Sequence, residues 1–213
     1  TFTREVSHDG SNLVIDGDKI FISSNEHAAN LPWKEHNIDV VLECTGSFTE
    51  RETAEQHLTS GAEKVLFSCP AQPDVDATIV YGLNHQTLTP KDRIVSNASC
   101  TTNCISHIIR ILHDHLGIEN GVITTIHSMM NDQPVIDAYH NPDLRKSRSS
   151  SNSIIPVTTG LAKGVDRVFP HLHGRFKAVA LRVPTMNVST MQLTVTVKKS
   201  ADAAPINGFF RAE

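Results

Sequence analysis

The sequence has little of what marks metal-binding, secreted and membrane proteins. It has only four cysteines, and their spacings match no metal site or disulfide framework, so we expect reduced thiols and no bound metal; they are Cys44, Cys69, Cys100 and Cys104. No apolar run approaches the roughly 18 residues of a membrane span, and the first 20 residues lack the order of a signal peptide. We therefore expect a cytoplasmic protein that binds no membrane.

The distribution of charge excludes a further class. Nineteen Lys and Arg residues stand against 23 Asp and Glu, and no basic tract could follow the backbone of a nucleic acid. The 213 residues are 39% hydrophobic, which is enough to bury a core without metals or disulfides. Thr1 is not an initiator methionine and residues 203–211 begin an amphipathic helix, so we expect a segment of a longer protein.

The first half of the sequence alternates short apolar runs with helix-forming segments. Residues 12–23 alternate apolar and polar side chains around Gly17, which predicts a hairpin. A helix is predicted over residues 49–60, ending at Gly61. Short apolar runs of the buried-strand type cover residues 38–44, 64–68, 77–82 and 93–97. This order predicts the later strands of a parallel, Rossmann-type α/β sheet.

The second half predicts a different kind of domain. A helix over residues 101–116, closed by Gly117, carries apolar residues at the 3.6-residue period. Segments rich in β-branched residues follow at 121–130, 176–183 and 186–199. Residues 128–153, here called the excursion, are long, polar and poorly periodic, and loops of that length in compact domains are usually functional.

Cys100 stands where a predicted strand gives way to a predicted helix. Free N–H groups and the positive end of the helix dipole stabilise a thiolate there, and the same N–H groups can hold an oxyanion. The neighbouring Ser99 and Thr101 offer hydroxyls and amides to a phosphate group. The alternative is a small structural cysteine, because free cysteine is among the most buried residue types.

His127 ends a predicted strand just before the excursion. An imidazole titrates close to neutral pH, so it can take a proton from a thiol and return one to a developing oxygen. The sequence has 12 histidines, and most of them must be ordinary surface residues. Position alone therefore leaves both a catalytic and a structural role open for His127.

Several cations suit a phosphate ester, because a guanidinium can donate two parallel hydrogen bonds to it. They are Arg145, Lys146 and Arg148 in the excursion and Arg182 at a strand end. Thr159 and Gly160 add a hydroxyl and a flexible backbone. For the excursion cations, a solvated basic surface is the alternative interpretation.

Together these segments resemble the glyceraldehyde-3-phosphate dehydrogenase superfamily from about residue 39 to residue 199. The Ser-Asn-Ala-Ser-Cys-Thr-Thr-Asn-Cys string at residues 96–104 is similar to that family's nucleophile signature. Four further segments resemble family motifs in the family's order: Glu43-Cys44-Thr45-Gly46, Thr124-Thr125-Ile126-His127, Ser153-Ile154-Ile155-Pro156 and Arg182-Val183-Pro184-Thr185.

The resemblance implies an NAD-dependent oxidation of a phosphosugar aldehyde, with Cys100 as the nucleophile and His127 as its base. It implies substrate contacts from Ser99, Thr101, Thr159, Gly160 and Arg182, and a phosphate contact from Arg145 or Lys146. Thr45, Gly46 and Ser68 resemble positions near the nicotinamide. By this resemblance residues 1–99 form the C-terminal part of a Rossmann-type NAD-binding domain. Residues 100–213 form an α+β catalytic domain with a mainly antiparallel sheet.

Within the superfamily the excursion is the distinguishing segment. Glyceraldehyde-3-phosphate dehydrogenases commonly carry a Thr-Gln-Lys-Thr run and a Gly-Ala-Ala-Gln stretch there, whereas residues 131–140 and 149–152 differ from both. These residues are more similar to the branch that oxidises D-erythrose 4-phosphate. The alternatives are a phosphorylating glyceraldehyde-3-phosphate dehydrogenase and, from another class, a cysteine hydrolase without a cofactor.

The sequence also departs from the family. The family often has two adjacent arginines where this sequence has Arg145 and Lys146, so a point charge replaces a bidentate group. The family's Gly-x-Gly-x-x-Gly type loop and its nicotinamide-orienting asparagine are absent, so we expect these residues alone to bind NAD poorly. The excursion resembles the family's inter-subunit loop, which implies a homotetramer.

Overall fold

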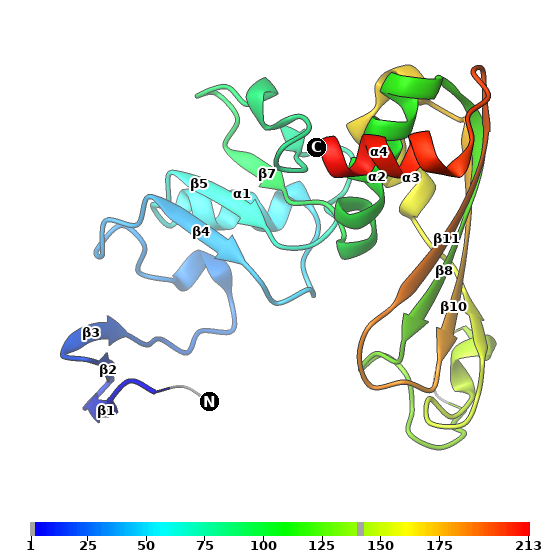
Figure 1. Cartoon of the computed structure of the whole chain (residues 1–213). Helices are drawn as coiled ribbons and strands as arrows, with labels where there is room; N and C mark the ends of the chain where they lie inside the picture. Colours follow the sequence, from blue (N-terminus) through cyan, green and yellow to red (C-terminus); the bar gives the residue numbers. More distant parts are fainter. Residues whose placement is uncertain (1–2, 140–142) are drawn as a thin grey trace.

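The computed structural model describes residues 3–139 and 143–213, which form three β-sheets. Figure 1 shows them in chain order: a small amino-terminal sheet, a parallel sheet with short strands, and a sheet with much longer strands. In this part of the chain, no helix combines the length and the apolar character that crossing a membrane requires.

The amino-terminal sheet is an antiparallel meander of β1 (Val6–Asp9), β2 (Asn12–Ile15) and β3 (Asp18–Phe21). The predicted hairpin is confirmed, and its turn places Asp16 and Gly17 at φ angles of 51° and 89°. The sequence pattern does not mark β1, because Val6 is the only apolar residue among its four and no alternation can be seen.

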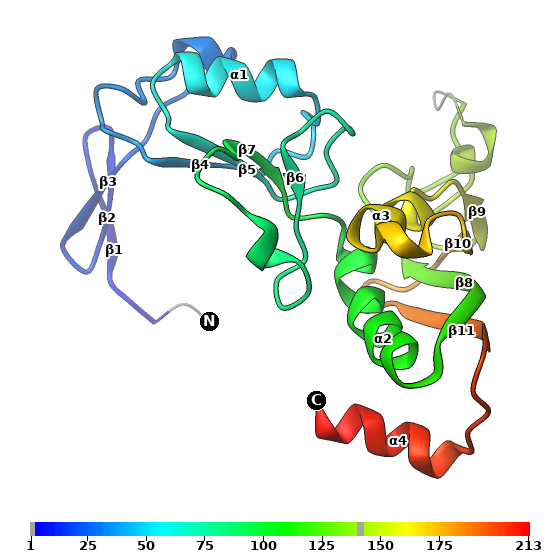
Figure 2. The same cartoon turned by 90° about the horizontal axis from the view of Figure 1, so that it is seen from above.

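The second sheet is wholly parallel, in the order β4-β5-β7-β6. Its strands are β4 (Val40–Glu43), β5 (Lys64–Phe67), β6 (Ala77–Thr78) and β7 (Ile94–Ser96). Helix α1 (Arg51–Thr59) lies over one face (Figure 2), and buried apolar side chains such as Phe67 and Ala54 form the core between them. The Rossmann-type parallel sheet predicted from the sequence is therefore confirmed.

One predicted strand is shorter than expected. The apolar run over residues 77–82 forms a strand only at Ala77–Thr78 and then turns. The Asn84 side chain accepts a hydrogen bond from the Val80 backbone N–H at 2.8 Å and donates one to the Thr78 carbonyl at 2.9 Å. These side-chain bonds take the place of strand pairing, which the apolar pattern alone does not reveal.

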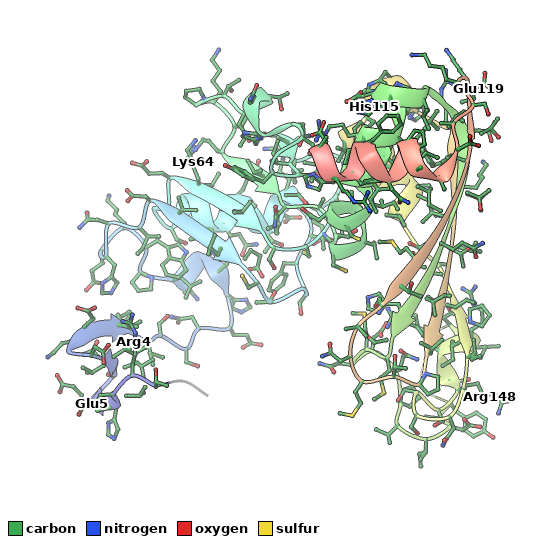
Figure 3. All side chains as sticks on the ribbon, in the orientation of Figure 1. Arg4, Glu5, Lys64, His115, Glu119 and Arg148 are labelled. Carbon is green, nitrogen blue, oxygen red and sulfur yellow. The ribbon has the colours of Figure 1, made fainter. Side chains whose placement is uncertain are left out.

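The third sheet has the order β11-β8-β10-β9. Its strands are β8 (Ile118–Ser128), β9 (Ile155–Val157), β10 (Phe176–Val183) and β11 (Thr190–Val197). The β8–β10 pair is parallel and the other two pairs are antiparallel, so the prediction of a mainly antiparallel sheet is confirmed. Figure 3 marks the two ends of this sheet, with Glu119 at one end and Arg148 of the excursion at the other.

Three helices accompany the third sheet: α2 (Cys100–Leu116), α3 (Leu161–Val168) and α4 (Ala203–Ala212). The predicted helix over residues 101–116 is confirmed as α2, and it ends at Gly117 in the left-handed region. Its buried face, including Ile105 and Ile109, joins side chains of α3, β8 and β10 in a second core. Short 3-10 turns lie at Ala28–Asn30, His85–Thr87, Leu144–Ser147 and Pro170–Leu172.

His113 in the last turn of α2 should make folding stability depend on pH. Burial lowers its pKa from the ordinary value of 6.5, and the charge of nearby His171 adds to that effect. The uncharged ring also accepts a hydrogen bond from the Ile118 N–H at 3.1 Å. Because the unfolded chain takes up this proton at higher pH, the contribution of His113 is complete above pH 6.5 and is lost as the pH falls below it.

We therefore expect the melting temperature of the full-length protein to decrease as the pH is lowered from neutral to about 5.5. The melting temperature of the His113→Gln variant should decrease less steeply. Thermal unfolding followed by circular dichroism at several pH values measures both slopes. The exposed His115, which stacks on Phe209, gives the control variant His115→Gln. Equal slopes for the wild type and His113→Gln would contradict this assignment.

Candidate active site

The turn that leads into α2 is unusually tight. Ala98 has a φ angle of 57°, in the left-handed region that non-glycine residues seldom occupy, and it is buried. The strand β7 ends two residues earlier, at Ser96. Such a conformation persists only where the surroundings hold it, and backbone strain of this kind is concentrated at functional sites.

Polar side chains of the string at residues 96–104 hold the backbone of this turn in place. The fully buried Ser96 hydroxyl accepts hydrogen bonds from the Ala71 and Ala98 N–H groups and donates to the Cys69 carbonyl at 2.8 Å. The Asn103 side chain donates to the carbonyls of Asn97 and Ser99 at 2.8 and 3.0 Å. The side chains of the string therefore hold its own strained backbone, which explains why so many small polar residues gather around the cysteine.

Ser99 is the N-cap of α2, and its hydroxyl accepts a hydrogen bond from the Thr102 N–H at 3.0 Å. The same hydroxyl contacts the Thr101 and Thr102 hydroxyls at 3.1 and 2.8 Å. The resemblance predicts a substrate contact from Ser99. Its first role in the structure is to cap the helix that carries Cys100.

Cys100 is the first residue of α2, and its side chain is exposed. The N–H groups of Cys100 and Thr101 have no acceptor in the described part of the chain, since the first bonds of the helix begin at Thr102 and Asn103. Two free N–H groups and the helix dipole thus face the space beside the thiol. This arrangement can stabilise both a thiolate and the oxyanion formed when it attacks a carbonyl.

His127 lies one residue before the end of β8 and is half-buried. Its Nδ1 lies 2.8 Å from the Ser128 carbonyl oxygen, which can only accept, so the proton is assigned to Nδ1. The Nε2 lone pair is then left to take a proton. No hydrogen bond joins the His127 ring to the Cys100 thiol in residues 3–139 and 143–213, so the action of His127 on Cys100 stays a prediction from the sequence.

The parallel pairing of β8 and β10 sets Arg182 directly beside His127. Side chains at paired positions of neighbouring strands point to the same face, about 5 Å apart. The Arg182 guanidinium donates to Asp132 at 3.3 Å and to the Gln133 side-chain oxygen at 3.2 Å. The candidate base and the candidate phosphate-binding arginine therefore share one site.

Lys146 joins this site from the excursion. Its ammonium lies 2.6 Å from Asp132, the same carboxylate that contacts Arg182. Burial alone would raise the pKa of Asp132, but Lys146 and Arg182 outweigh it, so the pKa of this carboxyl is lowered. Sequence reasoning missed Asp132, because an acid that pairs with cations 14 and 50 positions away leaves no local signal.

The other excursion cations have local partners. Arg145 donates two hydrogen bonds to the Asp143 carboxylate, at 2.9 and 2.8 Å, which lowers the pKa of that carboxyl. Arg148 donates to Asp137 at 2.7 Å. Of the two phosphate candidates, the structure thus brings Lys146 to Arg182 and pairs Arg145 elsewhere. His140, within the distinguishing stretch 131–140, lies outside the described residues.

A pocket of about 280 Å³ opens beside the nucleophile turn, where α2 and α3 both begin. It brings together the predicted substrate residues Ser99, Thr101, Thr159 and Gly160. Lys163, on the first turn of α3, also lines it and was not singled out by sequence reasoning. Hydroxyls, helix N-termini and an ammonium are a suitable lining for an oxyanion.

The predicted cofactor residues follow the carboxyl ends of the parallel strands. Thr45 and Gly46 come after β4 and Ser68 after β5, at the same sheet edge from which β7 leads to Cys100. Ligands of open α/β sheets bind at this edge. A groove of about 640 Å³ separates Thr45 and Gly46 from residues 129–132, which follow His127.

These residues fit the nicotinamide side of a dinucleotide. Gly46 has a φ of 69° and nothing within 4 Å of the position that a Cβ would occupy, so its backbone is open to a ligand. Within the described residues, no group of three or more His, Cys, Asp or Glu side chains is arranged to hold a metal ion. The open backbone of Gly46 and the hydroxyls of Thr45 and Ser68 would hold the nicotinamide cofactor that the resemblance implies.

Cys69 lies near the same edge but is less suited to be a nucleophile. Burial raises the pKa of its thiol, and the negative charge of Glu43 raises it further. A raised pKa keeps the thiol protonated at neutral pH, and the thiol is a weaker nucleophile than the thiolate. Among the cysteines, the exposed Cys100 at a helix N-terminus is the better candidate.

Gly164 lets α3 pack closely on the first turn of α2. A Cβ at this position would lie 2.5 Å from the Thr102 hydroxyl, which is buried and bound to Ser99. We expect Gly164→Ala to destabilise the full-length protein by about 1–3 kcal/mol, because neither partner can move away easily. Urea unfolding measures this, with Gly208→Ala in α4 as the control, since nothing lies within 4 Å there. If both substitutions left stability unchanged, the α2–α3 contact would be looser than described.

Two protein-family models match the chain, one over its carboxy-terminal part and one over its amino-terminal part. Residues 99–213 match the family model described as glyceraldehyde 3-phosphate dehydrogenase, C-terminal domain. Residues 1–51 match the model described as glyceraldehyde 3-phosphate dehydrogenase, NAD binding domain. The matches identify NAD as the cofactor and an aldehyde as the kind of group that is oxidised. The chain belongs to the glyceraldehyde 3-phosphate dehydrogenase family.

Proposed function

We propose that the protein oxidises D-erythrose 4-phosphate to 4-phospho-D-erythronate with NAD. The observation that carries this proposal is the composition of the excursion where it meets Arg182. Asn131, Asp132 and Gln133 stand there, and Asp132 joins Lys146 to Arg182. This segment resembles the four-carbon branch of the superfamily more than the three-carbon branch.

The chemistry follows from the candidate residues. The Cys100 thiolate attacks the aldehyde carbon, and the electron pair of the carbonyl bond moves to the oxygen, beside the N–H groups of Cys100 and Thr101. The protonated His127 gives that oxygen its proton, which completes a hemithioacetal. NAD, when bound, accepts a hydride. The proton on the hemithioacetal oxygen returns to His127 as the carbonyl of the thioester forms.

Water then releases the product. After His127 has released its proton to solvent, water attacks the thioester carbon and gives a proton to His127, and the sulfur of Cys100 leaves as the thiolate. Lys146 and Arg182 hold the substrate phosphate, which requires Asp132 to share its two cations with the ligand. The acid formed would supply pyridoxal 5'-phosphate biosynthesis, in the cytoplasm.

A phosphorylating glyceraldehyde 3-phosphate dehydrogenase is the second candidate. The pocket lined by Thr101, Thr159 and Lys163 favours it, because its hydroxyls and ammonium suit an inorganic phosphate that could attack the thioester instead of water. A cysteine hydrolase, from another class, does not need the cofactor residues at the sheet edge.

We also infer that the protein acts as a homotetramer. Apolar side chains are exposed on the long-stranded sheet at Val122 and Val179, and in the excursion at Val135 and Ile136. We take these exposed apolar side chains as surface that further copies of the chain would bury.

Substrate assays on the full-length protein separate the first two candidates. We expect NADH formation from D-erythrose 4-phosphate without inorganic phosphate, with a kcat/KM at least about ten-fold above that for D-glyceraldehyde 3-phosphate. The absorbance of NADH measures the rate with each of the two aldehydes. If glyceraldehyde 3-phosphate were the only one of the two aldehydes to be oxidised, and its oxidation required inorganic phosphate, the second candidate would be selected.

Arg182→Ala should lower kcat/KM for the phosphorylated aldehyde by about 10- to 100-fold, because a charge-assisted bond to the phosphate is lost. Arg148→Ala is the matched control, since Arg148 pairs with Asp137 on the outside of the excursion. Steady-state kinetics with D-erythrose 4-phosphate compares the two variants. Similar losses in both would show that the phosphate lies elsewhere.

A further inference from the structure

A buried polar cluster lies below the cofactor edge of the parallel sheet. It consists of Glu43 at the end of β4, His57 in α1 and Trp33 in the segment before β4, here called the Trp33–His57–Glu43 cluster. Figure 2 shows α1 lying over the sheet. His57 in this helix lies 3.5 Å from the Glu43 carboxylate at the end of β4. Glu43 and His57 are each only 5% exposed. Buried charged groups are rare unless hydrogen bonds satisfy them.

The hydrogen bond between Trp33 and His57 determines which nitrogen of the His57 ring carries the proton. The Trp33 indole can only donate, and its Nε1 lies 3.0 Å from His57 Nδ1, so the Nδ1 atom accepts. In the neutral ring the proton is therefore assigned to Nε2. That atom faces the Glu43 carboxylate at 3.5 Å and has no hydrogen-bond partner in the described residues. The Glu43 carboxylate is therefore an acceptor to which this buried N–H can turn.

The other end of the cluster is the turn after β4. The second carboxylate oxygen of Glu43 accepts hydrogen bonds from the Thr45 N–H at 2.7 Å and from the Thr45 hydroxyl at 2.6 Å. The Thr45 hydroxyl in turn accepts from the Ser47 N–H at 3.2 Å. One buried carboxylate therefore fixes both the backbone and the side chain of Thr45 and, through Ser47, the far side of Gly46.

We propose that Glu43, held by His57 and Trp33, is a positioning residue for NAD, acting through the Thr45–Gly46 turn. Thr45 and Gly46 are exposed and line the groove beside residues 129–132. The three cluster residues do not line this groove; they line a second pocket, which they share with Thr45. Fixing the turn before binding removes the cost of ordering it when the cofactor arrives. This inference rests on the NAD cofactor of the family and not on the identity of the aldehyde.

A purely structural cluster makes a different prediction. If Glu43 and His57 only satisfy each other in the core, their loss lowers the stability of the domain without a selective effect on NAD. If they position the turn, the affinity for NAD falls while the Cys100 site, on a different strand and helix, keeps its reactivity. The two readouts must therefore be measured together.

The experiment uses the full-length protein and four variants. Glu43→Gln removes the charge, and His57→Leu removes the donor, whereas His57→Gln keeps a side-chain N–H that can face Glu43. Glu63→Gln is the control, because Glu63 is exposed just before β5, at the opposite edge of the sheet. NAD titration by calorimetry measures the Kd, and iodoacetamide labelling without NAD measures the reactivity of Cys100.

We expect Glu43→Gln and His57→Leu to raise the Kd for NAD by about ten-fold or more, with Cys100 labelling within about two-fold of the wild type. His57→Gln should recover most of the affinity, and Glu63→Gln should change neither quantity. Unchanged Kd values for Glu43→Gln and His57→Leu, whatever their melting temperatures, would overturn the proposal.

Thr45 provides a second test that leaves the buried pair intact. Thr45→Val removes the hydroxyl that contacts Glu43, and Thr45→Ser retains it. We expect a raised Kd for NAD in the first variant and a near-normal Kd in the second; equal values for the two would count against the proposal even if the Glu43 variants failed to fold. Because Kd is measured without aldehyde, failure of the erythrose 4-phosphate assay would leave this result standing.

Discussion

Cys100→Ser should abolish NADH formation by the full-length protein, with a loss of more than about 10³-fold in kcat. A serine hydroxyl at this position is not ionised near neutral pH, so the free N–H groups of Cys100 and Thr101 have no thiolate to stabilise. Steady-state measurement of NADH absorbance gives the rate. The structural cost of the change is small, because the side chain is exposed.

Cys104→Ser provides the matched control for this variant. Cys104 is also an exposed thiol and lies one turn further along α2, away from the free N–H groups at the start of the helix. We expect this variant to keep its rate within about two-fold. If Cys100→Ser retained activity, or if Cys104→Ser lost it, the assignment of the nucleophile would be wrong.

His127→Asn should lower kcat by about 10²- to 10⁴-fold, which is the usual contribution of a general acid–base group. Asparagine can still donate a hydrogen bond near the Ser128 carbonyl, but it cannot take a proton from a thiol. Labelling of Cys100 by iodoacetamide should slow in parallel, since both reactions need the thiolate. Stopped-flow measurement of NADH formation separates this loss from slow product release.

His173→Asn is the control for the histidine. His173 is an exposed residue after α3 that contacts Asp166 at 3.3 Å. It lies beyond the carboxyl end of that helix, whereas the pocket beside Cys100 lies at its amino end. A normal rate in His127→Asn would leave the protein without its candidate base. A loss of the same size in both variants would instead point to a general effect on folding.

The elements that surround the site could largely be predicted from sequence. Helix α2 carries a strong apolar period and a closing glycine, and the strands β8 and β10 are rich in β-branched residues, so local pattern and final structure agree. The run at residues 77–82 forms a shorter strand than its apolar pattern predicts, because the Asn84 side chain replaces strand bonds with its own. Such competition between side chain and backbone is invisible in an apolar pattern.

The site itself was predictable in its parts but not in its contacts. The sequence predicts Cys100 as a candidate at a strand-to-helix turn and His127 as a candidate near a strand end, and the structure shows that the motif around Cys100 is a self-supporting turn. The strained backbone of Ala98 could not be predicted, because alanine has no preference for a left-handed conformation. The ion pairs of Asp132 and the cluster around Glu43 join residues distant in sequence, so only the fold reveals them.

The family match and the geometry of α2 converge on one claim, that Cys100 forms the covalent intermediate of an NAD-dependent aldehyde oxidation. Mass spectrometry of the full-length protein, quenched in acid after mixing with NAD and D-erythrose 4-phosphate, tests it most directly. We predict a mass increase equal to the phosphoerythronyl group on the peptide that contains Cys100, and none on Cys104. NADH formation without any adduct on Cys100, or with the adduct on another cysteine, would contradict the account.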